Sequence, residues 1–213
     1  MDYRLAGLEN FGEFAPYEVS GKYEIPVIYP ETMPDIKQWI GFNYAKSEQC
    51  SAETGVHFFL DDYQFQSVWT YPERYTSKFV GYGAVMSPDF STYVDMPKAL
   101  QIYNHYRKHW CAQYWQSMGV KVIPTISWSD DESFEWCFDG EPRGGVVAIS
   151  TVGCERRRDD YERFRNGYNA MLAALYPSNI IVYGKRFDYM DEKVITVIEP
   201  FYKQMKERVK NGR

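Results

Sequence analysis

Acidic side chains directly follow two apolar segments of the chain, where they could carry acid–base or metal chemistry. Asp61 and Asp62 come after the apolar run 55–60, and Asp89 comes after the apolar run 79–86. Paired carboxylates can activate a water molecule or hold a divalent cation such as Mg2+, which prefers oxygen ligands. These three residues are therefore the candidate catalytic residues. Asp62 is the strongest of them, because a carboxylate buried among apolar neighbours is costly unless a partner or a function retains it.

Residues that could bind a substrate follow the other apolar runs. Lys46 could hold a phosphate group, and Arg156 and Arg157 could do so together with the N-terminus of the helix expected after them. The rings of Tyr63 and Trp128 could stack on a flat ligand such as a base or a sugar. The full candidate binding set comprises Asn43, Lys46, Tyr63, Trp128, Ser150, Thr151, Arg156 and Arg157.

Each of these residues also has a purely structural interpretation. An aspartate at a strand end often caps the helix that follows, which suits Asp61 as well as a catalytic role does. A run of arginines among acids is usually a solvated helix start, and most aromatic residues belong to a core. Capping and solvation explain less well why acids, a lysine and arginines all follow apolar runs.

The histidines and cysteines give weaker signals. His105 and His109 lie four residues apart on an expected helix, which is a metal-chelating spacing, but the residues between them are cationic and the HExxH motif is absent. We therefore expect a solvated helix face there, and we expect His57 to be a hydrogen-bonded core histidine. The four cysteines form no closely spaced pair, which favours free buried thiols over disulfides or a zinc site.

The composition limits the class of protein. The chain has 213 residues, a formal net charge of −5 and 18% aromatic residues. The acidic balance argues against a protein that coats duplex nucleic acid, since that function needs a basic face. No apolar run approaches the roughly 20 residues of a membrane span, and the polar N-terminus lacks the apolar region of a signal peptide. A globular protein of the cytoplasm is expected, and P-loop, Rossmann and nucleophile-elbow motifs are absent.

Six apolar segments alternate with helical patterns along the chain. Because they are continuously apolar, they are typical of strands covered on both faces. The strands are expected at 39–46, 55–60, 79–86, 120–127, 145–151 and 179–183, and the main helices at 97–118, 159–175 and 192–209. This alternation indicates parallel pairing.

The fold expected from this pattern is a single α/β domain over residues 35–213. It has about six mainly parallel strands alternating with helices, arranged as a partial or small (β/α) barrel or as an open doubly wound sheet. Residues 1–34 contain Pro26, Pro30 and Pro34, a spacing that disfavours both a helix and a central strand. This segment is expected to be an extended N-terminal arm.

Several of these segments, taken together, resemble a known family. They are FNYAK at 42–46, HFFLDDYQF at 57–65, MSPDFSTYVDMP at 86–97, QIYNHYR at 101–107, VIPTISW at 122–128 and AISTVG at 148–153. As a set, over about residues 25–208, they resemble the bacterial and phage family catalogued as domain of unknown function 4417. The resemblance implies a protein of phages, plasmids or other mobile elements, with a role in nucleic-acid metabolism or host–phage conflict. It implies no reaction and identifies no catalytic residue.

Two main functional hypotheses follow from these observations. The leading one is a hydrolase-like enzyme that acts on a nucleotide, a nucleoside or a nucleic-acid end through a carboxylate-rich pocket at the strand ends, with a divalent cation such as Mg2+ as the candidate cofactor. A sugar substrate would use the same residue types. The alternative is a non-catalytic binding protein that sequesters a nucleotide ligand or blocks a host factor. A structural or assembly role is a third interpretation, and the oligomeric state is left open.

Overall fold

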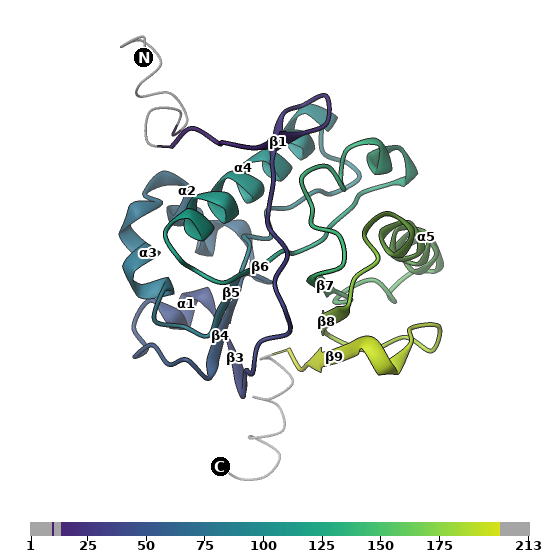
Figure 1. Cartoon of the computed structure of the whole chain (residues 1–213). Coiled ribbons are helices and arrows are strands. Elements are labelled where there is room, and N and C mark those ends of the chain that lie inside the picture. The colour runs from purple at the N-terminus through teal and green to yellow at the C-terminus, as the bar shows by residue number, and fades with distance from the viewer. Residues whose placement is uncertain (1–9, 11–13, 201–213) are drawn as a thin grey trace.

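Two parallel sheets form the centre of the protein in the computed structural model, which describes residue 10 and residues 14–200 (Figure 1). The first sheet has the order β3-β4-β5-β6, with β3 at Gln38–Gly41, β4 at Thr54–His57, β5 at Ala84–Met86 and β6 at Val122–Ile123. The second has the order β7-β8-β9, with β7 at Val146–Ser150, β8 at Asn179–Tyr183 and β9 at Ile195–Ile198. Every neighbouring pair in both sheets is parallel. The expected α/β class with mainly parallel strands is therefore confirmed.

The two sheets are joined where the chain leaves β6. Thr125 forms a parallel bridge with Ala148 of β7, the Ala148 N–H donates to the Pro124 carbonyl at 2.8 Å, and the Ile126 N–H donates to the Ala148 carbonyl at 2.8 Å. The seven strands thus lie side by side in chain order, which is the order of a (β/α) barrel rather than of a doubly wound sheet. Within the described residues β3 and β9 do not pair with each other, so the barrel is not closed.

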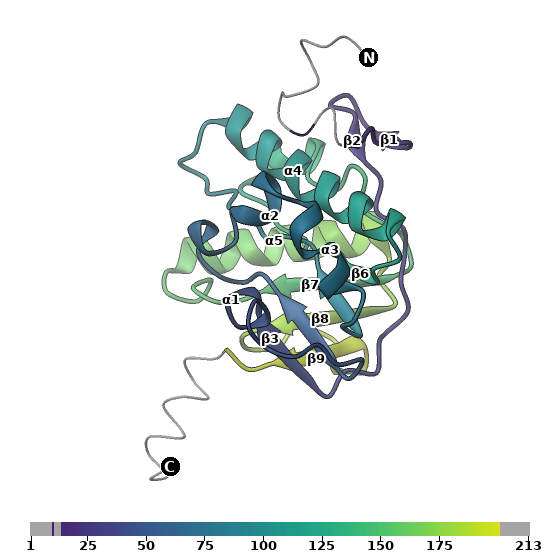
Figure 2. The same ribbon diagram turned by 90° about the vertical axis from the view of Figure 1, so that its left-hand side faces the viewer.

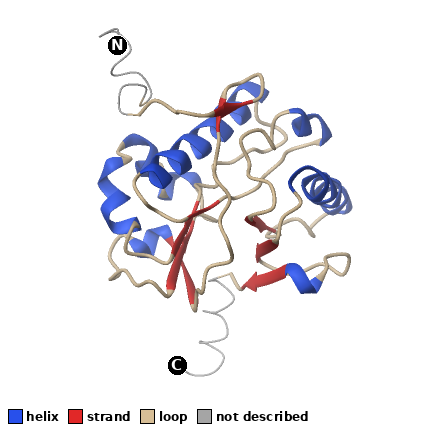
Figure 3. Cartoon of the chain, in the orientation of Figure 1, coloured by secondary structure: helices blue, strands red, loops and turns tan. Residues whose placement is uncertain are grey.

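The helices lie outside the strands (Figures 1 and 2). The long helices are α4 (Lys98–Ser117) and α5 (Arg158–Leu175), and the short ones are α1 (Phe42–Ala45), α2 (Ser67–Thr70) and α3 (Glu73–Phe79). Single 3-10 turns occur at η1 (Asp62–Gln64), η2 (Asp131–Glu135) and η3 (Glu192–Val194). Figure 3 shows these helices around the strands and the loops that connect them.

Side chains alternate along the strands and fill three apolar clusters. Outward residues of the first sheet, such as Val56 and Val85, pack with Trp115 of α4. Outward residues of the second sheet, such as Ile149, pack with α5. Inward residues of both sheets share a third cluster that includes Met86 of β5. Because strands covered on both faces must be apolar on both, this packing explains their continuous apolar sequences.

The described part of the N-terminal segment runs across α4 in an extended conformation (Figure 1). It contains the short antiparallel pair β1 (Val19–Ser20) and β2 (Ile25–Pro26). The Gln113 amide of α4 donates to the carbonyls of Glu18 and Val27, each at 2.9 Å. Ile25 and Ile28 are fully buried. This segment therefore contributes to the core as well as covering α4.

Some element boundaries differ from those expected. The expected helix at 192–209 is wrong over its first part: residues 195–198 form β9, because the β-branched run Ile-Thr-Val-Ile pairs with the edge of β8. Residues 201–209 of that expected helix lie outside the described residues. The strand expected at 39–46 ends at Gly41 and continues as α1, and the strand expected at 79–86 begins only at Ala84 because α3 extends to Phe79.

Candidate functional site

A cavity of about 370 Å³ opens at the carboxyl ends of β5, β6 and β7. Its walls include Asp89 from the segment after β5, Trp128 from the segment after β6 and Ser150 at the end of β7. Cavities in parallel α/β folds that bind substrates lie at this end of the strands. Three of the residues expected to form the site are therefore brought together in one pocket.

Asp89 is the pocket residue best suited to acid–base chemistry. Its carboxylate has no hydrogen-bond partner among the described residues, and burial raises its pKa to about 7, from an ordinary value of 3.8. The charge of Lys108 opposes this increase, whereas the charge of Asp62 adds to it. A carboxyl group with a pKa near 7 can both donate and accept a proton at neutral pH, as a general acid or base must.

Asp62 has a different role from the one expected for it. Its carboxylate accepts hydrogen bonds from the Ser91 hydroxyl at 2.8 Å and from the Ser91 backbone N–H at 3.2 and 3.3 Å. These bonds hold the segment after β5, which carries Asp89. Asp62 is near enough to raise the pKa of Asp89, but it does not line the cavity.

Trp128 forms an aromatic wall of the cavity. Its ring packs against Phe164 of α5, with ring centroids 5.2 Å apart. It also lies directly over Gly167, where a Cβ atom would come within 2.1 Å of the indole nitrogen. The α5 glycine thus permits the close approach that fixes the tryptophan in the pocket wall.

Further charged groups of the pocket come from α5. Asp160 and Arg163 both line the cavity and form an ion pair with 3.2 Å between a carboxylate oxygen and a guanidinium nitrogen. Asp95, which precedes α4, adds another carboxylate. None of these three residues is in the set expected from the sequence, although Asp160 and Arg163 follow strand β7 within the first turns of the expected helix, where a search of strand-end segments could have found them.

The remaining expected catalytic and phosphate-binding residues do not line this cavity. Asp61 is exposed at the start of η1, where its side chain makes no capping hydrogen bond. Lys46 donates to the Gln64 carbonyl at 2.9 Å. Arg156 and Arg157 are exposed, and the Arg157 guanidinium lies 3.6 Å from Asp160.

The other members of the expected binding set are also elsewhere. Tyr63 is 79% exposed, and Asn43 lies on α1 with its side-chain oxygen buried and without a hydrogen-bond partner. The Thr151 hydroxyl donates to the Lys185 carbonyl at 2.9 Å and accepts from the Lys185 N–H at 2.8 Å. Thr151 therefore ties the end of β7 to the end of β8.

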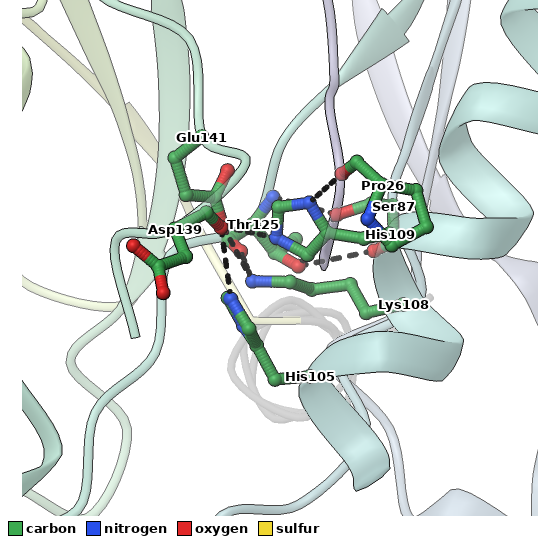
Figure 4. Close-up of polar contacts among 8 residues, drawn as sticks. All are labelled: Pro26, Ser87, His105, Lys108, His109, Thr125, Asp139 and Glu141. Carbon is green, nitrogen blue, oxygen red and sulfur yellow. Dashed lines mark hydrogen bonds and ion pairs between the residues drawn. The ribbon is translucent and has the colours of Figure 1, made fainter. Parts of the chain in front are cut away.

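A second polar cluster is buried between α4 and the segment 139–141 (Figure 4). It contains His105, Lys108 and His109 from α4, together with Glu141. The solvated helix face expected for the two histidines is therefore wrong. The segment 139–141 and the N-terminal arm cover this face of α4 and supply carbonyl and carboxylate partners, which the sequence between the histidines does not indicate.

Lys108 and Glu141 form the ion pair at the centre of this cluster. The Lys108 ammonium lies 2.6 Å from one Glu141 oxygen and donates to the Thr125 carbonyl at 2.8 Å. Both side chains are almost fully buried. Burial alone would raise the pKa of Glu141, but Lys108 and His109 beside it hold that pKa below its ordinary value. Glu141 is therefore ionised.

The two histidines of the cluster are held by backbone carbonyls. His105 Nε2 lies 3.0 Å from the Asp139 carbonyl, and His109 Nδ1 lies 2.8 Å from the Pro26 carbonyl (Figure 4). Burial lowers the pKa of both rings. At His109 the Glu141 carboxylate opposes this decrease, whereas the charge of Lys108 adds to it.

His57 lies apart from this cluster, at the end of β4. It is buried as expected, but its Nδ1 atom has no hydrogen-bond partner, and burial lowers its pKa to about 4. Its ring packs on Tyr183 of β8, with centroids 4.7 Å apart. It borders a cavity of about 830 Å³ between β3 and β9, where the barrel is not closed.

All four cysteines are free thiols. Cys111 and Cys137 are buried, as expected, but Cys50 is exposed. Cys154 lines the cavity near Asp89, and burial raises its pKa to about 11. The Cys154 thiol therefore stays protonated at neutral pH and is a weak nucleophile.

Comparisons with known proteins give the family. The chain is 40% identical over 173 residues to the Gene 1 protein of Mycobacterium phage L5, which covers 79% of the chain and 74% of that protein. It is 38% identical over 186 residues to the Gene 1 protein of Mycobacterium phage D29, which covers 85% of the chain and 67% of that protein. No solved structure matches the chain. None of the helices in residues 14–200 combines the length and the apolar character needed to cross a membrane. The model of the family named Domain of unknown function (DUF4417) matches residues 17–202, and the chain belongs to this family.

Proposed function

We propose that this phage-related protein is a hydrolase-like enzyme that uses Asp89 as its general acid or base. The observation that carries this proposal is the position of the Asp89 carboxyl group, which lines the strand-end cavity, has no hydrogen-bond partner among the residues that the structure describes and has a pKa of about 7. A structural carboxylate is usually hydrogen-bonded or paired. An unpaired one with this pKa inside a cavity is typical of a catalytic group.

The lining of the cavity favours a neutral ring compound as the substrate. Trp128 offers a face for stacking, and the hydroxyls of Ser127 and Ser150 can exchange hydrogen bonds with a sugar or a base. The cavity lining contains three carboxylates, from Asp89, Asp95 and Asp160, but one guanidinium group, from Arg163. A nucleoside fits this chemistry better than a nucleotide, because the phosphate of a nucleotide would meet these carboxylates.

A binding protein that sequesters the same ligand is the second candidate. The hydrogen bonds of Asp62 favour this second candidate, because the carboxylate expected to act together with Asp89 accepts hydrogen bonds from Ser91 instead. Asp160, a further acid of the cavity, is paired with Arg163. Sequestration would use the same aromatic and hydroxyl groups without needing a second free acid.

The test is incubation of the purified protein with a panel of nucleosides and their 5′-monophosphates, followed by denaturation and mass spectrometry of the released compounds. The enzyme proposal expects product from a nucleoside, and at least about a 100-fold lower rate for Asp89→Asn, which removes the general acid. Asp188→Asn, a change of an exposed acid outside the cavity, is the matched control and should keep the full rate. Release of an unchanged nucleoside would instead support sequestration. If the protein neither forms a product nor retains a compound, both candidates are contradicted.

A further inference from the structure

The contact between His109 and Glu141 is incomplete as it stands. His109 Nδ1 faces the Pro26 carbonyl at 2.8 Å, and its Nε2 atom faces an oxygen of Glu141 at 2.9 Å. Both oxygens are acceptors, whereas an imidazole with a single N–H can donate to only one of them. Because a carbonyl can only accept, Nδ1 carries a hydrogen. A second ring proton or a metal ion is therefore needed between Nε2 and Glu141.

His105, one helical turn earlier, is also held by a backbone carbonyl. Its Nε2 atom faces the Asp139 carbonyl at 3.0 Å, so Nε2 carries a hydrogen and Nδ1 is the nitrogen left to bind a metal. The two ring centroids are 4.3 Å apart. Histidines that bind metals usually donate the other ring N–H to a carbonyl or a carboxylate in this way, which fixes the tautomer and orients the ring.

One carboxylate oxygen of Glu141 remains available to bind a metal ion. Its Oε1 atom accepts a hydrogen bond from the Lys108 ammonium and faces His109, whereas its Oε2 atom is buried and has no hydrogen-bond partner within the described part of the chain. One candidate ligand atom from each of His105, His109 and Glu141 can be chosen so that all lie within 4.8 Å of one another. Lys108 does not exclude a ligand role for Glu141, because carboxylates that bind metals are themselves commonly hydrogen-bonded.

The backbone brings the parts of this cluster into contact. Gly140 has a φ of +72°, and a Cβ atom there would lie 2.6 Å from the Pro26 carbonyl oxygen and 2.9 Å from His109 Nδ1. Glycine at this position is what lets the segment 139–141 lie against the histidine. A cavity of about 460 Å³ is lined by Asp139, Gly140 and Glu141, and so borders the segment that carries the carboxylate.

We propose that His105, His109 and Glu141 form a buried binding site for a divalent transition-metal ion of the zinc type. Two imidazole nitrogens and one carboxylate oxygen are donors that Zn2+ accepts. The bound ion would link α4 to the segment 139–141 and, through the Pro26 carbonyl, to the N-terminal arm. Its role is structural, because all three side chains are buried away from the Asp89 cavity. This proposal does not depend on the proposed enzymatic function.

The test uses the full chain, stripped of metal by a chelator in denaturant and then refolded with or without one equivalent of ZnCl2 or CoCl2. We expect about one metal ion per chain by elemental mass spectrometry and visible absorption bands from bound Co2+. We also expect a melting temperature at least about 5 °C higher with ZnCl2 than with chelator.

Variants of the proposed ligands locate the site. If these variants do not fold, the metal content and melting temperature of the wild-type chain still decide the test. His105→Gln and Glu141→Gln should lose stoichiometric metal, whereas His57→Gln, a change of a buried histidine outside the cluster, should retain it. Fewer than about 0.1 ions per refolded wild-type chain, with equal melting temperatures in ZnCl2 and chelator, would overturn the proposal. A proton would then hold His109 and Glu141 together. Retention of the metal by both cluster variants would overturn it as well.

Discussion

Ser91 donates to both carboxylate oxygens of Asp62, through its hydroxyl at 2.8 Å and through its backbone N–H at 3.2 and 3.3 Å. This pair joins the segment after β4 to the segment after β5. Because Asp89 lies two residues before Ser91, the position of the candidate catalytic carboxyl group depends on it. Asp62 therefore acts as an anchor for the wall of the cavity.

Substitution of Asp62 measures how much its hydrogen bonds to Ser91 contribute to the free energy of unfolding. Asp62→Ala should lower the free energy of unfolding by about 2 kcal/mol, because hydrogen bonds to a charged acceptor are lost. Asp62→Asn keeps one acceptor oxygen and should lose less. Urea unfolding of the two variants and the wild type gives the comparison. A loss below about 0.5 kcal/mol for Asp62→Ala would mean that the bonds to Ser91 contribute little.

The same two variants separate anchoring from catalysis. If Asp62 acts only on stability, Asp62→Asn should process or bind its ligand as the wild type does, since the fold is kept. If Asp62 is catalytic, as the sequence alone suggests, loss of its negative charge should abolish turnover at nearly unchanged stability. Melting temperature and ligand conversion measured on this one variant distinguish the two roles.

Asp89 should make the stability of the protein depend on pH. Its pKa is about 7 in the folded protein, above its ordinary value of 3.8, so the folded state binds more protons between these values. The stability contributed by this group is therefore greatest below about pH 4 and is lost as the pH rises to about 7. Asp89→Asn should remove this dependence, so the variant should lose less stability than the wild type between pH 5 and pH 8.

Urea unfolding at these two pH values checks the prediction for Asp89. The exposed Asp188→Asn variant serves as the control and should show the wild-type dependence on pH. Equal pH dependence in Asp89→Asn and the wild type would show that the Asp89 carboxyl group titrates normally and would weaken its proposed catalytic role.

Breaking the Lys108–Glu141 pair should be costly. The two side chains are almost fully buried, so Lys108→Met leaves the Glu141 charge without its partner. We expect a loss of about 3–5 kcal/mol in the free energy of unfolding, measured in the presence of chelator. The double variant Lys108→Met with Glu141→Gln should recover part of this loss, because the buried charge is removed as well. The two single variants each lose free energy of unfolding. If the double variant loses more than the sum of these two losses, this account is contradicted.

Trp110 of α4 should be a major source of core stability. It is fully buried and packs edge-to-face on Trp69 and Phe14, with ring centroids 5.4 and 5.6 Å away. Trp110→Ala should cost about 3–5 kcal/mol, measured by urea unfolding. Tyr71→Ala, which removes an exposed ring, is the control and should change stability by less than about 0.5 kcal/mol. A loss below about 1 kcal/mol for Trp110→Ala would contradict the packing seen around it.

Much of the architecture could be predicted from local patterns. Continuous apolar runs identify β8 with its observed bounds, and helical spacing closed by Gly119 identifies α4. Strand β9 was missed, because its sequence joins a polar helical pattern and its pairing with β8 is visible only in three dimensions. The order of the strands could not be predicted either, since alternation of strands and helices is common to barrels and doubly wound sheets.

The candidate site could be predicted only where the chain itself brings residues to a strand end. Asp89, Trp128 and Ser150 were found because each follows a strand. Arg156 also follows a strand but does not line the cavity, because position along the chain does not fix the direction of a side chain. Lys46 does not line it either, because α1 separates this residue from the end of β3. The buried cluster was misjudged for a related reason. The partners of His105 and His109 come from the distant segments 139–141 and 25–26, which leave no mark on the sequence of α4.

The sparse backbone pairing between β6 and β7 predicts which parts of the protein unfold independently. The strands of each sheet are paired along their length, but among the described residues the backbone pairing between the two sheets is a single bridge at Thr125 and Ala148. Local unfolding follows the least connected boundary, and amide hydrogen exchange reports it. The amides of β8, in the middle of its sheet, should therefore exchange as one cooperative unit, separately from those of β4. The N–H groups of Ala148 and Ile126, which span the boundary, should lose protection before either unit does.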